Sequence, residues 1–196
     1  MAAGTDTHNA LVAAEEDNFY GKFASSEPGA GRADENAMKF GDRVVKGWEL
    51  TAAGYTAVWA TENTREAIWD AIKRKETYAT TGSRMWLRFF GGYDFVAADT
   101  TTRAPAIAGY RKGVPMGGDL PKAAAGKAPT FLVAAARDPY GGNLDRVQVI
   151  KGWVDKAGKT HEKIFDVAWS NPEQRKVGVN GKLTPVGSTV DIATAS

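Results

Sequence analysis

The clearest hydrophobic pattern along the chain predicts a helix in residues 64–75. Its apolar side chains recur at the spacing of one helix face: Ala67, Ile68, Ala71 and Ile72. Asn63 is expected to cap the first turn, and Glu66 three residues later fits a capping box. The pattern therefore predicts an amphipathic helix from about Thr64 to Lys75.

After Gly82 the pattern changes to a period of two, which is typical of strands. Strands are predicted after this point at Arg84–Phe90, Pro129–Ala136, Leu144–Val154 and Thr160–Trp169, and a short extended segment is predicted before the helix at Tyr55–Trp59. The turn residues Asp155–Lys159 join the last two strands as a hairpin. Weaker signals predict short strands at Val44–Leu50, Ala106–Arg111 and Ser188–Thr194, and an exposed loop at Ser25–Asn36.

These elements divide the chain into two regions. Residues 1–82 are predicted as mixed α/β, and residues 83–196 as an antiparallel sheet or sandwich. The predicted fold class is therefore α+β. The boundary is open, because Arg84–Phe90 could pair with either region.

Composition narrows the partners rather than the fold. With 196 residues the chain can form one large domain or two small ones, and its net charge of +2 is too small to indicate a nucleic-acid partner. The absence of cysteine excludes disulfides and thiolate chemistry. The longest apolar runs, such as Phe131–Ala136, are far shorter than the roughly 20 residues of a membrane span.

Asp6 and His8 form an Asp-x-His pair near the first residue. On an extended segment, residues two apart point to the same side with Cα atoms about 6.5 to 7 Å apart, so both could reach one ion. Carboxylate and imidazole together suit Zn, Mn or Fe. Two ligands are an incomplete site, and a polar N-terminal tail is the alternative interpretation.

The sequence around this pair resembles a family of large bacterial proteins of unknown function that is related to the PHP (polymerase and histidinol phosphatase) metal-dependent hydrolases. The resemblance rests on six sequence segments: Gly4–Asn9, Glu15–Phe19, Ala57–Trp69, Arg74–Gly82, Arg88–Gly92 and Leu144–Trp153. They extend over nearly the whole chain.

The resemblance implies a distorted (β/α) barrel with a cluster of metal ions, whose last motif, Asp-x-His, falls on Asp6 and His8. The chemistry expected of the parent is hydrolysis of a phosphate or similar ester by metal-activated water. The family's earlier motifs, a His-x-His pair among them, are not found here, since the other histidine is His161. The resemblance thus implies a C-terminal fragment: the end of a barrel (1–82), then a β-sandwich-like domain (83–196), inactive alone.

Such a fragment is expected to bind a divalent metal weakly or not at all. Its partner would be the N-terminal barrel portion, and the apolar surface left without it is expected to drive self-association. Family members often carry export signals, so a periplasmic parent is expected. The alternatives are a stand-alone β-sandwich module that binds without catalysis, and a metalloenzyme whose site is assembled between two chains.

A few other residues are candidates for chemistry. His161 is predicted to be a solvent-facing strand residue. Thr80, Thr81 and Gly82 could line the rim of an active site, or serve only as a turn. Arg84, Trp86 and Arg88 share one strand face that could bind an anion, although a solvated face is the favoured interpretation.

Overall fold

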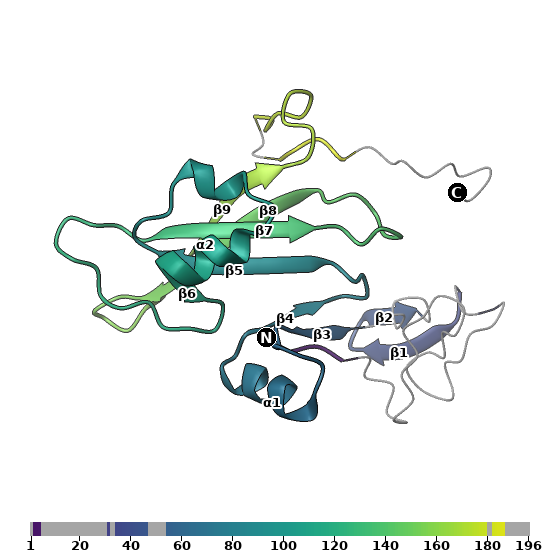
Figure 1. The fold of residues 1–196 in the computed structure, drawn as a ribbon. Helices are drawn as coiled ribbons and strands as arrows, with labels where there is room; N and C mark the ends of the chain where they lie inside the picture. Colours follow the sequence, from purple (N-terminus) through teal and green to yellow (C-terminus); the bar gives the residue numbers. More distant parts are fainter. Residues whose placement is uncertain (1, 5–30, 32–33, 47–53, 180–181, 187–196) are drawn as a thin grey trace. The chain divides into compact units, whose positions relative to one another are not determined.

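The structure is a computed structural model that describes residues 2–4, 31, 34–46, 54–179 and 182–186 (Figure 1). The chain divides into two compact units, Met1–Ala135 and Ala136–Ser196. The sequence-based division near residue 82 stays a prediction.

Strands dominate both units. The first unit contains β1 (Asn36–Phe40), β2 (Arg43–Lys46), β3 (Tyr55–Val58), α1 (Arg65–Lys73), β4 (Thr77–Thr80), β5 (Trp86–Gly92), a 3-10 turn (Ala97–Thr100), α2 (Pro105–Lys112), β6 (Gly113–Pro115) and all but the last residue of β7 (Thr130–Ala136). The second unit contains β8 (Arg146–Val154) and β9 (Thr160–Trp169). The predicted α+β class is confirmed, as a fold with many strands and few helices.

Helix α1 connects the antiparallel strands β3 and β4. Its N-cap is Thr64, whose hydroxyl accepts a hydrogen bond from the Ala67 amide at 3.3 Å. The predicted cap, Asn63, is therefore wrong by one residue, because threonine satisfies the same free amides of the first turn. The apolar face of the helix buries Ala71 completely.

A three-stranded sheet, in the order β6-β5-β7, forms the centre of the first unit with helix α2. Phe90 on β5 is buried, and a Cβ placed on Gly109 of α2 would lie 2.5 Å from its ring. Glycine is thus required at position 109, because it lets the helix backbone approach the aromatic ring. Leu132 on β7 is also buried.

The strand predicted at Ala106–Arg111 is wrong, since these residues belong to helix α2. Pro105 begins the helix, where its missing amide costs nothing, and Arg111 and Lys112 occupy the last turn, where positive charge is favourable.

Strand β1 was not predicted. It pairs with β2 in a tight hairpin whose turn contains Gly41 at φ 59°. The segment predicted as a loop, Ser25–Asn36, ends at the first residue of β1, and most of it lies outside the described residues. The predicted strand Ser188–Thr194 also lies outside them.

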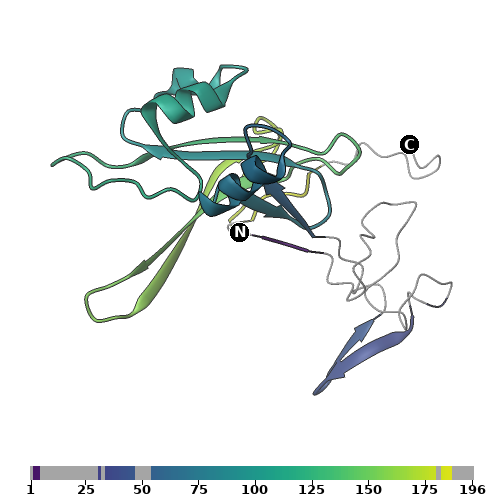
Figure 2. The same cartoon turned by 60° about the horizontal axis from the view of Figure 1, so that its bottom comes forward.

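The predicted hairpin of the second unit is confirmed. Strands β8 and β9 form a long antiparallel ribbon, drawn in light green in Figure 2, from Arg146 opposite Trp169 to Val154 opposite Thr160. Asp155 closes its turn, because one carboxylate oxygen accepts the amides of Ala157 at 2.9 Å and Lys159 at 3.0 Å.

The sheets of the described residues have two or three strands each, and they form no barrel. The barrel origin of residues 1–82 and the sandwich-like character of residues 83–196 therefore stay predictions. In the described part of the chain, no helix is long and apolar enough to span a membrane.

Candidate functional site

A buried carboxylate lies at the polar centre of the first unit. Glu76 lies three residues after the end of α1 and directly before β4, and it is 3% exposed. Its Oε1 accepts a short hydrogen bond from the Tyr110 hydroxyl and lies 3.4 Å from Nη1 of Arg88. Its Oε2 lies 3.5 Å from Nη2 of Arg74. Because a buried charge is costly unless it is paired, these three partners allow the carboxylate to remain inside the fold.

Arg88 of β5 lies between two aromatic rings of this cluster. Its guanidinium carbon is 3.2 Å from the centroid of the Trp59 ring, and its Nη1 donates to the Tyr110 hydroxyl at 3.1 Å. Trp59 also contacts Trp86 edge-on, with centroids 5.6 Å apart. The favoured interpretation of this strand face as solvated is wrong at Arg88, whose side chain is 14% exposed. The physical reason is Trp59, which packs over the face and replaces water.

Tyr110 acts as a neutral donor in this cluster. Half of its surface is exposed, but its hydroxyl lies against Glu76. Burial of the phenol, followed by the hydrogen bond to Glu76, raises the pKa of Tyr110 above its ordinary value. The cluster therefore joins α2, β5 and the segment between α1 and β4, with the Tyr110 hydroxyl as a neutral donor at neutral pH.

Thr80, at the end of β4, is 6% exposed, and its buried hydroxyl has no hydrogen-bond partner among the described residues. Gly82 follows with φ 124°, a backbone conformation that favours glycine. The turn interpretation of Thr80–Gly82 thus has structural support at Gly82. A role for the same residues at an active-site rim stays a prediction.

Residues 2–4 lie along β3 and lead toward the Asp-x-His pair. The Ala3 amide donates to Oγ1 of Thr56 at 2.8 Å, and this hydroxyl donates back to the Ala3 carbonyl at 2.8 Å. A Cβ on Gly54 would lie 2.6 Å from the Gly4 carbonyl oxygen. Asp6 and His8 lie outside the described residues. The described residues contain no group of three histidine, cysteine or acidic side chains that could hold a metal ion.

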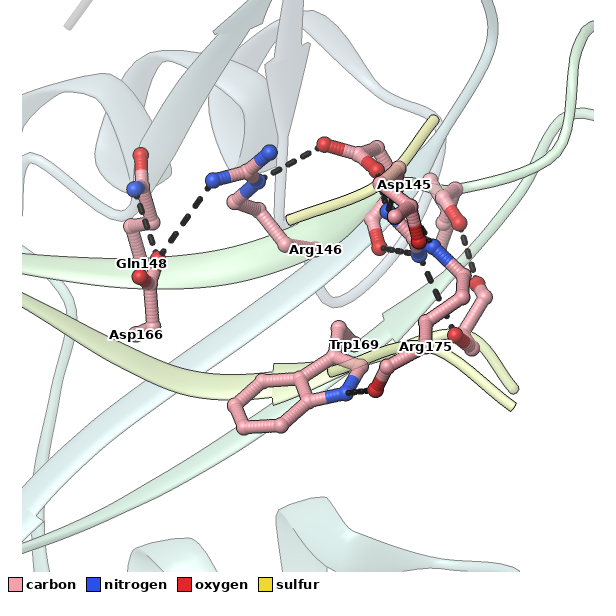
Figure 3. Close-up of polar contacts among 9 residues, drawn as sticks. Asp145, Arg146, Gln148, Asp166, Trp169 and Arg175 are labelled. Atoms are coloured by element: carbon pink, nitrogen blue, oxygen red, sulfur yellow. Dashed lines mark hydrogen bonds and ion pairs between the residues drawn. The ribbon is translucent and has the colours of Figure 1, made fainter. Parts of the chain in front are cut away.

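Arg175 is the corresponding buried charge of the second unit (Figure 3). Its side chain is 5% exposed and makes five hydrogen bonds, to the carbonyls of Thr184, Asp145 and Ser170 and to the Asp145 carboxylate. Arg146, and then Arg175, hold the pKa of Asp145 below its ordinary value. All the donors of Arg175 are directed at the chain itself, so it organises the loop after β9 rather than binding a ligand.

Sequence reasoning missed Glu76 and Arg175. Their partners are distant in sequence, or are backbone carbonyls, and neither leaves a local spacing signal. His161 is in a strand as predicted, but it is not simply solvent-facing. Its ring stacks on Trp153 with centroids 5.2 Å apart, and its Nε2 lies 2.7 Å from the Asp155 carboxylate.

A family model described as "Protein of unknown function (DUF3604)" matches residues 1–196. The chain belongs to this family. No curated protein and no solved structure matches the chain significantly. The predicted membership of a family of unknown function is thus confirmed, whereas the DUF3604 match gives no link to PHP hydrolases. The relation to PHP hydrolases therefore stays a prediction.

Proposed function

We propose that this DUF3604 chain contributes Asp6 and His8 to the metal site of a PHP-like hydrolase that cleaves a phosphate or similar ester. The observation that supports this most is the reciprocal hydrogen bonding between Ala3 and Thr56, at 2.8 Å in each direction. It holds the chain against β3 three residues before Asp6. A segment that is fixed so close to a ligand pair favours a defined ligand geometry.

The end of strand β3, against which that segment lies, is held in place by further hydrogen bonds. The Trp59 amide, just after β3, donates to the Glu76 carbonyl at 3.0 Å, and the Trp59 indole donates to the Leu87 carbonyl at 3.0 Å. The Glu76 cluster fixes the same region from the side of α2. In this proposal the cluster has a positioning role: it keeps β3 and β4 in place for the segment that carries the ligands.

The donor set fits a divalent ion of the Zn, Mn or Fe type, because it combines a carboxylate with an imidazole. Such an ion would supply the Lewis acidity for ester hydrolysis. Two donors do not complete a site, and the described residues offer no group of three. The remaining ligands would therefore come from residues that the structure does not describe, or from another polypeptide.

The test uses the intact gene product that contains this sequence. Bound metal is measured by mass spectrometry, and turnover is measured with an aryl phosphate ester. We expect Asp6→Ala and His8→Ala each to remove most of the metal and to lower turnover by roughly 100-fold or more. His161→Ala is the matched control, because it removes the other histidine and should change neither reading.

Metal content that is unchanged in both Asp6→Ala and His8→Ala would contradict the proposal. A wild-type protein that holds no metal and hydrolyses no ester would also contradict it. The second result would favour the alternative, a β-rich module that binds without catalysis.

A further inference from the structure

Hairpin β8–β9 carries opposite charges on its two faces. Since side chains alternate along a strand, the register places one set of six on a common face: Val149, Lys151, Trp153, His161, Lys163 and Phe165. We call this the basic face. The opposite face, here the acidic face, carries both carboxylates of the strands, together with three aliphatic side chains: Ile150, Val154, Glu162, Ile164 and Asp166. Asp166 accepts a hydrogen bond from Gln148 at 2.7 Å and lies 4.0 Å from Nη1 of Arg146, so Glu162 is the carboxylate that this face offers to a second copy.

The centre of the basic face is a pair of like charges. Lys151 and Lys163 are directly opposite each other, and neither forms an ion pair with a described residue. Their ammonium groups lie over the rings of Trp153, at 5.1 Å, and Phe165, at 5.0 Å. Like charges in directly opposed positions destabilise a sheet. A carboxylate brought to this face from outside would relieve the repulsion.

The acidic face offers such a carboxylate with room around it. Glu162 is opposite Gly152, and a Cβ on Gly152 would have only the His161 carbonyl within 4 Å, at 3.9 Å. Ile150 and Ile164 form the neighbouring pair and are 59% and 53% exposed. The acidic face is therefore an aliphatic surface with a carboxylate beside an open position.

We propose that the basic face of one copy of the chain stacks on the acidic face of a second copy. In this arrangement each cross-strand pair on the basic face of one hairpin contacts a pair on the acidic face of the other. The contacted pair is the next one along the hairpin, one residue further toward the turn. The aliphatic–aromatic pair Val149–Phe165 meets Ile150–Ile164, the pair Lys151–Lys163 meets Gly152–Glu162, and the pair Trp153–His161 meets Val154–Thr160. The first matched pairs are thus wholly apolar, the third bring Trp153 against Val154, and the lysines meet the carboxylate at the glycine.

This contact joins two different surfaces, so it is heterologous. Each copy in a pair retains one unused face, and association continues into larger assemblies or closes into a ring. This goes beyond the proposed hydrolase function and does not depend on Asp6 or His8. It also predicts strong dependence on salt, since the lysine–carboxylate contact lies near solvent.

The test measures the mass of the 196-residue chain by light scattering and sedimentation over a concentration series. We expect the mass to rise with concentration in the wild type. Lys163→Glu and Glu162→Lys should each weaken association by about tenfold or more, because each places like charges in contact. Both side chains are exposed, so the variants should keep the wild-type circular dichroism spectrum. Lys156→Glu, at the exposed turn, is the matched control and should change nothing.

Mixing is the decisive step. Lys163→Glu places a carboxylate on the basic face and leaves the acidic face unchanged, and Glu162→Lys places an ammonium group on the acidic face and leaves the basic face unchanged. Each copy in an equimolar mixture then meets opposite charge on the other variant, so the mixture should recover association. Recovery in the mixture supports the proposal. A wild type that is monomeric at every concentration overturns it. So does association that neither reversal weakens, or two weakened variants that remain apart when they are mixed.

Discussion

Among the residues that the structure describes, each unit buries one charged side chain, but the two units surround it in different ways. In the first unit the buried group is the Glu76 carboxylate, whose partners are the side chains of Arg74, Arg88 and Tyr110. In the second it is the Arg175 guanidinium, and most of its hydrogen bonds go to backbone carbonyls. The first arrangement joins secondary-structure elements to one another, whereas the second gives shape to a loop.

The difference follows from the apolar core that each unit has available. Ala71, Phe90 and Leu132 are buried in the first unit, and Leu183 is the buried apolar side chain among the described residues of the second. A two-stranded ribbon has little stability of its own, and a small apolar core cannot organise a long loop. We therefore expect hydrophobic packing to dominate stability in the first unit and Arg175 to dominate it in the second.

Phe90→Ala should have the largest effect and should be confined to the first unit. It removes a buried ring that packs against Gly109 and contacts Tyr110 edge-on. The expected loss is about 3 to 5 kcal/mol of unfolding free energy. Hydrogen exchange of the β5 amides measures it. Phe40→Ala is the control, since that ring is 65% exposed and its loss should cost less than about 0.5 kcal/mol. Equal loss of protection in β8 and β9 would show that the units do not behave separately.

Arg175→Met should lower stability by about 3 kcal/mol in the second unit, because it removes all five hydrogen bonds of a guanidinium whose side chain is 5% exposed. Exchange of the Gly178 amide, which donates to the Lys182 carbonyl at 2.9 Å, reports on this loop. Arg137→Met is a matched control. Arg137 also donates to three carbonyls, but it is exposed, so water can replace it. If the two variants lose the same unfolding free energy, the burial of Arg175 does not contribute to stability. The inferred difference between the two units would then be wrong.

The sequence predicted what local patterns determine. The stripe of Ala67 to Ile72 located α1, and the alternation on both sides of Asp155–Lys159 located the β8–β9 hairpin. Helix α2 was missed because its decisive contact, Gly109 against Phe90, joins two separate elements. The apolar packing that overrides a local pattern is not visible in the pattern itself.

Some residues of the candidate site could also be predicted from the sequence, and others could not. Asp6 and His8 could be named from their spacing and from the family resemblance, and they lie outside the described residues. The Glu76 cluster could not be named, since Arg88 lies 12 positions after Glu76 and Tyr110 34 positions after it. Only the fold brings these residues together.

Alkaline pH should weaken the first unit through Tyr110. Its pKa is raised in the folded state, so its contribution to stability is complete below the ordinary value of 10.0 and is lost as the pH rises through the folded value. Protection of the α2 amides should therefore fall above pH 10. Tyr110→Phe should be less stable at neutral pH and should lack this alkaline step. An unchanged step in Tyr110→Phe would assign it to another group.

Acid should weaken the hairpin turn of the second unit, and this is the smallest effect because the turn is on the surface. The hydrogen bond to His161, and then the bond to the Lys159 amide, hold the pKa of Asp155 below 3.8. Its contribution is therefore complete above that ordinary value and is lost as the pH falls through the folded value. The amide chemical shifts of Ala157 and Lys159 measure this loss, and Asp155→Asn should lack the titration. Turn amides that titrate equally in Asp155→Asn would show that the carboxylate does not close the turn. The register of the hairpin would then depend on its cross-strand pairs alone. Charged groups would in that case contribute less to the stability of the second unit than we infer from its comparison with the first.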